Sequence, residues 1–576
     1  LTPVYVDEIT DIPNIYLNQV LDNFDDIDNS SLKAPGDKGY YGMSRYVQNE
    51  IRNPIAQIDN THNRYYTDKF LGGIYATLKP IKGLSIRSAY DVDLAYGNNN
   101  YWTPEFYYHS VSFNYLSSVN QVTERWFTWQ WENVATYNTE IGNHNLTFLA
   151  GNTMRDFNYY YFGGLGEDLQ EESWDFAVFD AVLSDSTKSA VSGTRAQDRL
   201  LSYFGRINYN YDGRYLLGLT LRSDASSKLS SQNRTQYFPS VSLGWVASNE
   251  GFWNFDPINF LKVRLSWGQN GSIQSLGNFE YISTIASNAP ASYYVSGGNR
   301  LAGAEPTALS NPELIWETSE QLNFGIDMRF FRNRLSLTAD YYNKKTIGLI
   351  TTASIPEYVG NNKPNANAGD ITNRGIELEL NYRGQYGQLG YEVGANFAYN
   401  DNEVTTLESP LLGANLGTSG ALTRSDQGLP VWYFYGFETE GIFDSNEEIE
   451  AYVNEEGDLI EPAAIPGDVK FTDRNGDGII NEEDKTIIGS PHPDWMFGFN
   501  ASLDYRGFDL AVFINGTIGN EVYYGAYRTD LNNNNKPLFL YENAWTPDNP
   551  SNEFPRYTVN DNNNNFSHND LFVFDG

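Results

Sequence analysis

The chain has 576 residues and a formal net charge of −35, with 42 Tyr, 33 Phe, 12 Trp, 50 Gly and no Cys. Such acidity excludes nucleic acid as a partner, because the chain would repel a phosphate backbone. Runs of about 18 apolar residues are absent from the sequence, so a helix that spans a membrane is excluded as well. The abundant aromatic and glycine residues favour pleated strands joined by many turns.

Strict alternation of apolar and polar residues predicts β-strands along the chain. In residues 215–224, Leu217 and Leu219 share one face, whereas Thr220 and Arg222 share the other. The same period recurs at residues 322–331, 376–383, 391–400 and 499–506. These segments are close to the roughly 9–11 residues that a membrane-spanning strand needs.

Two architectures produce this alternation. A soluble sandwich or propeller buries the apolar face in a core, whereas a transmembrane barrel turns that face towards lipid around a polar lumen. Charged residues on the polar faces, and very short connections alternating with very long ones, favour the barrel. We therefore predict an all-β fold, in which residues 1–576 form part of a large antiparallel transmembrane β-barrel. The residues expected to face outward are Leu217, Leu219, Leu503, Leu510 and Val512, and those expected to face the lumen or its rim are Arg222, Asp504 and Arg506.

The short connections are flanked by aromatic residues. Asp212 and Gly213 form a strong signal for a two-residue hairpin turn, and Tyr209, Tyr211 and Tyr215 surround it. Rings gathered at one end of successive hairpins favour an interfacial girdle at the periplasmic turns over ordinary aromatic pairing across strands.

The long connections are predicted to face the outside of the cell. They are expected at residues 268–316, 350–373, 401–430, 440–494 and 520–576, with asparagine runs at 98–100, 532–535 and 562–565. The pairs Tyr101-Trp102, Tyr107-Tyr108 and Trp432-Tyr433 could stack on sugar rings, or could equally belong to the girdle or to loop packing. Phosphate loops, nucleophile elbows and metalloprotease helices are absent from the sequence, so no catalytic residue and no enzyme activity are predicted.

One local motif predicts a metal site. The sequence DRNGDGIINEED at residues 473–484 has the spacing of oxygen ligands in an EF-hand calcium loop, with Gly478 at the sharp bend. The expected Ca²⁺ ligands are Asp473, Asn475, Asp477, the Ile479 carbonyl, Asn481 and Asp484. An EF-hand normally has Glu at the last position, and the alternative to a metal site is an Asx-turn. We expect residues 467–489 to form an EF-hand-like calcium loop within an extracellular connection.

The chain resembles SusC/RagA-type outer-membrane proteins, a TonB-dependent family of Bacteroidota. The segments that carry the resemblance are residues 202–228, 238–245, 261–271, 311–327, 371–380 and 467–520. The longest of them, GDVKFTDRNGDGIINEEDKTIIGSPHPDWMFGFNASLDYRGFDLAVFINGTIGN, includes the candidate calcium loop.

The resemblance implies a barrel of about 22 strands with a plugged lumen, located in the outer membrane and in contact with its lipid. It further implies active import of oligosaccharides or oligopeptides, a SusD-like surface lipoprotein as partner, and energy from the TonB complex. The plug, the TonB box and the C-terminal strands are expected to lie outside this chain. The alternative functions are a siderophore or vitamin receptor, and a secreted β protein that binds or cleaves glycans.

Overall fold

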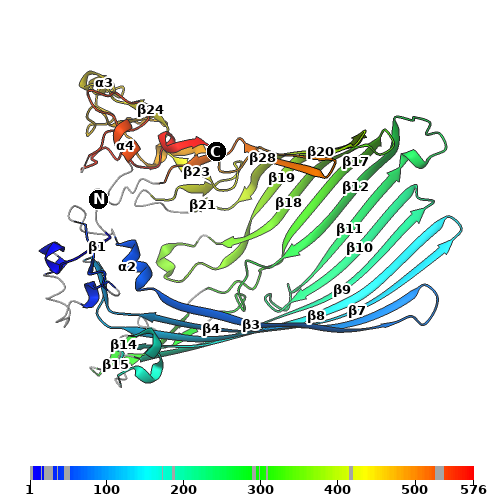
Figure 1. Cartoon of the computed structure of the whole chain (residues 1–576), viewed down its shortest axis with the longest axis horizontal. Helices are drawn as coiled ribbons and strands as arrows, with labels where there is room; N and C mark the ends of the chain where they lie inside the picture. The colour runs from blue at the N-terminus through cyan, green and yellow to red at the C-terminus, as the bar shows by residue number, and fades with distance from the viewer. Residues whose placement is uncertain are drawn as a thin grey trace.

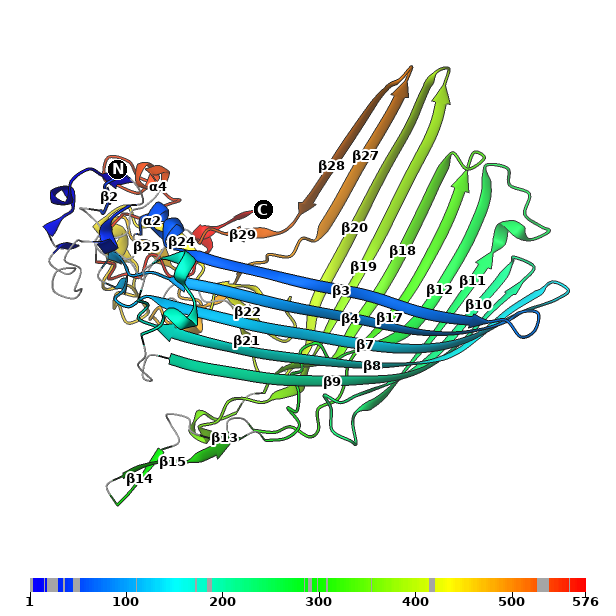
Figure 2. The same ribbon diagram turned by 60° about the horizontal axis from the view of Figure 1, so that its bottom comes forward.

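One antiparallel sheet of 14 strands dominates the structure and curls into an open trough (Figures 1 and 2). The computed structural model describes residues 4–14, 16–17, 30–34, 37–44, 52–109, 111–170, 173–183, 189–283, 285–287, 293–297, 299–306, 309–353, 355–413, 420–525, 538–558 and 560–576. The strands of the large sheet, in chain order, are β3 (His62–Leu78), β4 (Leu84–Thr103), β7 (Ser118–Ile141), β8 (His144–Glu167), β9 (Ser189–Tyr211), β10 (Tyr215–Ser226), β11 (Thr235–Val246), β12 (Ile258–Ser272), β17 (Glu317–Phe330), β18 (Leu335–Thr352), β19 (Asn365–Tyr386), β20 (Leu389–Leu407), β27 (Trp495–Tyr505) and β28 (Phe508–Ile518).

The strands lie side by side in the same order in which they follow one another along the chain, so the sheet is a continuous meander. The strand order runs from β28 through β27, β20, β19, β18, β17, β12, β11, β10, β9, β8, β7 and β4 to β3. Within the described residues the two outermost strands, β3 and β28, do not pair with each other. The all-β antiparallel prediction is therefore confirmed, and the sheet has the form of a barrel wall with two free edges.

The connections alternate in length, as the sequence predicted. The turn between β9 and β10 has positive φ angles at Asp212 (53°) and Gly213 (65°), which is the geometry of the predicted tight hairpin. Arg506 and Gly507 repeat it between β27 and β28, with φ angles of 52° and 86°. Nearly all the short turns lie at one end of the sheet, and the long connections gather at the other (Figure 1).

Several strands extend further than the sequence indicated. Strand β12 continues to Ser272, β18 to Thr352 and β20 to Leu407, and β19 begins at Asn365, all inside segments that were predicted to be connections. The asparagine run 98–100 lies within β4 rather than in a connection. In this region the apolar alternation has stopped, but the backbone hydrogen bonds of the ladder continue. Of the other two runs, 532–535 lies outside the described residues.

The two faces of the sheet differ in polarity. Residues that pair directly across strands lie on the same face. Leu219, its partner Ile207, and Leu510 and Val512 on the outer strand β28 are large apolar side chains that are exposed, and Val241, the other partner of Leu219, is half-buried. Thr220 pairs with Arg206 on the opposite face. An exposed apolar face opposite a polar one is the arrangement of a lipid-facing wall around a hydrated lumen. Leu503 is also exposed, and Leu217 is half-buried on the same apolar face.

The polar face carries ion pairs, both between strands and within a single strand. Arg264 on β12 contacts Asp327 on β17 (Nε to Oδ2, 2.8 Å) and Asp340 on β18 (Nη2 to Oδ2, 3.0 Å). Arg222 contacts Asp224 on the same face of β10 at 2.7 Å. Such charges are tolerated here because a lumen is filled with water, whereas the lipid side of the wall would exclude them.

The aromatic residues near the short turns share the apolar face and also contact one another. Tyr211 and Tyr215 pair across β9 and β10 with ring centroids 6.2 Å apart, and His144 stacks beside Tyr209 at 5.9 Å. Tyr382 and Tyr391 come together at 5.9 Å beside the turn between β19 and β20. The rings therefore form both the end-of-barrel belt and the cross-strand pairs that the sequence left as alternatives.

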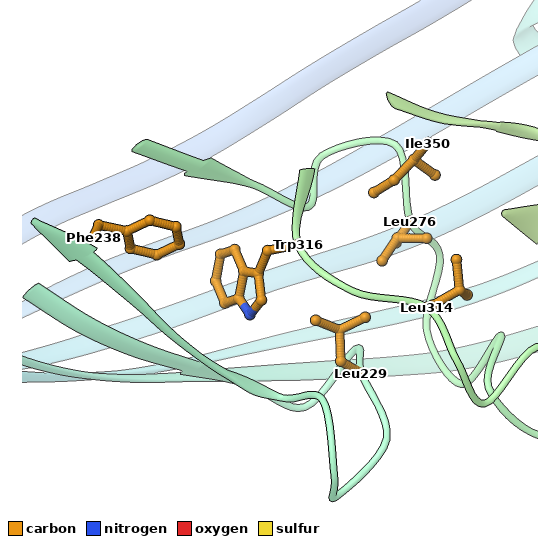
Figure 3. Packing of buried hydrophobic residues seen from close by; sticks show 6 residues of the cluster. All are labelled: Leu229, Phe238, Leu276, Leu314, Trp316 and Ile350. Carbon is orange, nitrogen blue, oxygen red and sulfur yellow. The ribbon is translucent and has the colours of Figure 1, made fainter. Parts of the chain in front are cut away.

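Small cores underlie the long connections instead of one central core. The cluster in Figure 3 joins the β10–β11 turn through Leu229, the β12–β17 connection through Leu276, Leu314 and Trp316, and β18 through Ile350. The Trp316 indole Nε1 donates to the carbonyl of Arg234 at 3.0 Å, and its ring meets Phe238 edge-on. Because the wall itself buries little apolar surface, these clusters hold the connections against the loop end of the sheet.

The remaining elements are short and lie among the connections. The helices are α2 (Pro54–Asp59), α3 (Asn446–Ala451) and α4 (Leu538–Asn543), with 3-10 turns at Ile9–Asp11, Ser30–Leu32, Trp174–Phe176, Phe179–Ala181, Ala247–Asn249, Glu357–Val359, Glu482–Asp484 and Asp570–Phe572. The short strands are β1 (Tyr5–Val6), β2 (Tyr40–Tyr41), β5 (Phe106–His109), β6 (Ser112–Asn114), β13 (Ile285–Ser287), β14 (Tyr293–Ser296), β15 (Asn299–Ala302), β16 (Ala304–Pro306), β21 (Leu411–Leu412), β22 (Thr423–Ser425), β23 (Tyr433–Gly436), β24 (Thr439–Ile442), β25 (Val469–Phe471), β26 (Thr486–Gly489), β29 (Glu521–Tyr523) and β30 (Val573–Asp575). None of the helices in the described part of the chain is long and apolar enough to cross a membrane.

Candidate functional site

Two connections that are distant in sequence fold into one body at the loop end of the sheet, which we call the loop module: residues 420–489 and 538–576. Strand β30 near the end of the chain pairs with β29, and Phe437 and Asn569 form a parallel bridge between the two segments. The Phe437 N–H donates to the His568 carbonyl at 2.8 Å, and the Thr439 hydroxyl donates to Asp570 at 2.6 Å. Figure 1 shows the yellow and red segments lying together beside the trough.

The loop module has its own apolar core. Phe437, Val469 and Phe471 are buried against Ile480 and Leu571, so both segments contribute to one cluster. A second cluster contains Phe443, Ile449 and Ala464 beside Tyr452. A connection of this length with a packed interior is a folded unit, which can hold side chains at fixed positions.

Buried polar groups join the two segments more closely. Asp468 is fully buried and accepts from Arg556 Nε at 2.6 Å, from Asn565 Nδ2 at 2.8 Å and from the backbone N–H of Ile465 at 2.9 Å. Asn565 in turn accepts from the N–H of Val469 at 2.7 Å. The asparagine run 562–565, predicted as part of a polar connection, therefore supplies buried hydrogen-bonding groups that hold the module together.

A second buried acid lies beside this network. Glu461 is 6% exposed, and it accepts from the N–H of Phe471 at 2.8 Å and from Asn563 Nδ2 at 2.9 Å. Burial raises the pKa of its carboxyl group to about 7, because removal from water disfavours the charged form; the nearby Asp468 acts in the same direction and Lys470 against it.

The predicted calcium loop is closed by its own hydrogen bonds. Asn475 Nδ2 and Asn481 Nδ2 donate to Asp477 Oδ2 at 3.0 and 3.4 Å, and Asn481 Nδ2 also lies 3.3 Å from the Ile479 carbonyl. Asp473 accepts from the N–H groups of Gly476 and Gly478 at 2.8 and 2.7 Å. Four of the six predicted ligands therefore contact one another around the bend.

Asp484, the last predicted ligand, has a different role. It is 1% exposed, and its carboxylate accepts from the N–H groups of Arg474, Asn475 and Asn481 at 3.0, 3.3 and 2.8 Å. It closes the loop in a capping box with Asn481. Among the described residues, no group of three or more His, Cys, Asp or Glu side chains is placed so as to hold a metal ion.

A cavity of about 1080 Å³ lies within the loop module, beside the candidate calcium loop. Its wall combines aromatic rings, amides and charges, among them Arg424, Tyr435, Phe437, Glu461, Glu482 and Asn563. Arg424 lies over the Tyr435 ring at 4.6 Å and Lys485 over the Phe437 ring at 5.1 Å. Sequence reasoning missed this cavity, because its walls come from two segments separated by more than seventy residues.

The structure separates the six aromatic residues proposed as platforms for sugar rings. Trp102, Tyr107, Tyr108 and Tyr433 are less than a tenth exposed, so the loop-packing interpretation holds for them. Tyr101 and Trp432 are 38% and 40% exposed. Only these two, among the six, present a ring to solvent.

Comparison with known proteins finds relatives along most of the chain. Residues 7–570 match the model of the family described as TonB dependent receptor-like, beta-barrel. TonB-dependent receptor P26 of Formosa agariphila is 30% identical over 538 residues, which cover 90% of this chain and 52% of that protein. TonB-dependent receptor SusC of Bacteroides thetaiotaomicron is 27% identical over 508 residues, covering 85% and 47%. The chain thus spans about half the length of the curated relatives it matches.

Solved structures give the same picture of the fold. The RagAB peptide importer in its open-open state superposes with a TM-score of 0.74 at 23% identity, covering 93% of this chain and 56% of that chain. The RagAB peptide transporter gives a TM-score of 0.73 at 22% identity, covering 90% and 56%. At this level of identity the likeness concerns the fold alone.

Proposed function

The chain belongs to the TonB-dependent receptor-like β-barrel family of the outer membrane, and from this membership we propose that it forms the barrel of an active importer of oligosaccharides or oligopeptides. Proteins of this family are transporters rather than enzymes. The proposal deals with the whole transporter, of which this chain is the part that carries the wall and the loop module.

The observation that carries the proposal is the loop module at the open end of a wall with a polar inner face. Its cavity of about 1080 Å³ is at the upper end of the sizes typical of ligand pockets. Amides from residues 562–564 and the carboxylates of Glu482 and Glu483 line it beside Tyr435. Such a lining provides hydrogen bonds for hydroxyl or peptide groups and an aromatic surface for packing, which suits an oligomer better than a compact metal chelate.

The proposed partners follow from the same family membership. A SusD-like surface lipoprotein would cover the loop end, and the TonB complex would supply energy through a plug domain. The RagAB complexes are named as peptide importers, which supports oligopeptides as one of the two ligand classes. The resemblance of residues 467–520 to SusC/RagA-type proteins supports the lipoprotein partner.

Growth and uptake measurements test this proposal. A strain that lacks the gene should fail to take up at least one class of labelled oligosaccharide or oligopeptide, and complementation should restore uptake only when TonB is present. Substituting Tyr435 with Ala should weaken uptake at low ligand concentration, whereas Trp253→Ala, at the opposite end of the sheet, should leave uptake unchanged. Uptake that persists without the gene or without TonB would contradict the proposal.

We further propose that residues 473–484 hold Ca²⁺. The donors are the oxygens of Asp473, Asn475, Asp477, the Ile479 carbonyl, Asn481 and Asp484, and a set made only of oxygens suits this hard cation. A bound ion would neutralise the acidic segment and stabilise the bend against charge repulsion. The loop supports the proposal in that four of these groups already contact one another. Because Asp484 already accepts hydrogen bonds from backbone N–H groups, we expect weak binding, with dissociation constants of roughly 10⁻⁴–10⁻³ M.

A further inference from the structure

The outward face of strands β7, β8 and β9 changes from apolar to charged part of the way along each strand. On β9, the residues that share a face with Leu219 of β10 run from Tyr209 through Ile207, Tyr203 and Leu201 to Arg199. The apolar section spans nine residues, close to the roughly 9–11 that cross a membrane. Because β9 is 23 residues long, the charged section lies beyond the hydrocarbon, towards the loop end.

A similar transition occurs on the adjacent strands, at the same level on β8 and further towards the loop end on β7. On β7, Phe127 is followed on this face by Arg125; on β8, Met154 is followed by Asp156. The cross-strand register aligns the transitions on β8 and β9, because Asp156 pairs with Arg199. On β7 the residue at this level is Trp129, and the charged residue Arg125 is reached four residues later, opposite Tyr160. The polar residues of β8 and β9 therefore form a belt directly above the apolar band, and Arg125 of β7 joins this belt at the level of Tyr160.

Two arginines in this belt flank one tyrosine. Tyr160 on β8 pairs directly with Arg125 on β7 and with Arg195 on β9, so all three side chains point outward in one row. The Arg195 guanidinium lies over the Tyr160 ring at 5.5 Å from its centroid. Two strand spacings separate Arg125 from Arg195, which is about 10 Å, and both side chains are exposed.

Acidic neighbours do not neutralise this row. Asp156 is engaged by Arg199 at 2.6 Å, and Asp68 lies two strands away from Arg125, beyond Tyr96. Neither Arg125 nor Arg195 forms an ion pair among those found in the described residues. In a chain with a net charge of −35, an uncompensated pair of cations at this position is conspicuous.

On the side towards the loop end, the belt stops at the folded connection of residues 173–183. Trp174 stacks on His62 at 5.7 Å, and Gly164 and Gly166 of β8 lie directly under Phe179 and Val182. Residues 173–183 therefore cover the outward face above the belt, so the belt is a strip of defined height between the apolar band and this cover. A strip continuous with the lipid-facing surface and bearing positive charge is complementary to anionic headgroups.

We propose that the row of Arg125, Tyr160 and Arg195 is a binding surface for the phosphate groups of anionic lipids in the outer leaflet. The two guanidinium groups would each bind phosphate oxygens with charge-assisted hydrogen bonds, which arginine forms more strongly than neutral donors. The tyrosine ring holds Arg195 in place and supplies the amphipathic group typical of the membrane interface.

Native mass spectrometry of the detergent-purified protein tests this proposal. Lipid A that carries phosphate groups should bind the wild type in preference to phosphatidylethanolamine. The variant R125Q/R195Q should lose roughly fivefold in affinity for each arginine removed, since a basic residue near an anionic surface contributes about that factor. Dephosphorylated lipid A should bind the wild type as weakly as intact lipid A binds the double variant.

The matched control is Arg374→Gln. Arg374 also lies on the outward face just beyond the apolar residue Ile376, but on the other side of the sheet, where Glu403 compensates it at 3.9 Å. Lipid binding should be unchanged in this variant, and the heat-dependent gel mobility of all variants should report a folded barrel. The single variant R195Q provides the same test if the double variant folds poorly. The proposal would be overturned if R125Q/R195Q and R195Q bound lipid A within twofold of the wild-type affinity. It would also be overturned if Arg374→Gln lost as much affinity for lipid A as these variants.

Discussion

Replacing Arg556 with leucine should open the loop module without unfolding the wall. Arg556 is the only basic side chain that contacts the fully buried Asp468 among the described residues, through bonds of 2.6 and 3.4 Å. Its removal leaves a buried carboxylate with two amide donors and no counter-charge. Breaking a buried ion pair on one side costs about 3–5 kcal/mol, and because the Arg556 side chain is 19% exposed we expect a value near the lower limit.

A loss of about 3 kcal/mol corresponds to a more than hundredfold increase in the open population of the module. Limited proteolysis measures this population when opening is fast relative to cleavage, so cleavage within residues 440–489 should accelerate by about that factor. Hydrogen exchange at the Val469 N–H, which donates to Asn565, should increase in parallel. Heat-dependent gel mobility should remain that of a folded barrel.

The control for this experiment is an exposed ion pair in the same module. Arg474 and Glu438 lie 3.1 Å apart, with both side chains more than two fifths exposed. Arg474→Gln should change protection by no more than about 1 kcal/mol, as for surface pairs in general. Equal cleavage rates in the two variants would refute the view that the buried pair, rather than the apolar clusters, joins the two segments.

Three further outcomes follow. The pKa of Glu461 is raised to about 7 in the folded protein, above its unfolded value. Its contribution to stability is therefore fully present below about pH 4.5 and is lost as the pH rises through 7. Protease protection of the module should fall between pH 5 and 8, and this fall should be smaller in Glu461→Gln. Leu219→Arg should destabilise insertion into bilayers by about 2–4 kcal/mol in urea titrations, whereas Thr220→Arg on the polar face should be tolerated. Replacing Asp473 and Asp477 with Ala should abolish any calcium-dependent protection of residues 440–489, and identical digestion of the wild type with calcium and with chelator would leave the loop as a turn without metal.

The strands were predictable wherever one face meets lipid. In β10, the regular succession of Leu217, Leu219 and Leu221 against polar neighbours predicted both the strand and the orientation of its faces. The same signal is absent where strands leave the membrane. Asn98 and Asn100 accept hydrogen bonds from Thr123 and Gln121 on β7, and backbone pairing with β7 sets the structure here without an apolar pattern.

The loop module was not predictable for a different reason. Asp468, Arg556 and Asn565 lie in acidic, asparagine-rich segments whose composition is typical of solvated connections. Their burial depends on contacts between residues about 90 positions apart, and neither local spacing nor hydropathy indicates such pairing. The candidate calcium loop, in contrast, was recognisable because all its groups lie within 12 consecutive residues.

The unequal lengths of the strands make the rim of the wall mechanically asymmetric. Strands β7 and β8 have 24 residues each, whereas β27 and β28 have 11, a difference of roughly 40 Å of extended chain at about 3.3 Å per residue. On the tall side the rim is a hydrogen-bonded sheet and bends little. On the low side its height comes from the loop module, which is joined to β20 by backbone hydrogen bonds between Val404 and residues 428 and 429. Anything that covers the rim would therefore rest on a continuous sheet on one side and on a folded loop unit on the other.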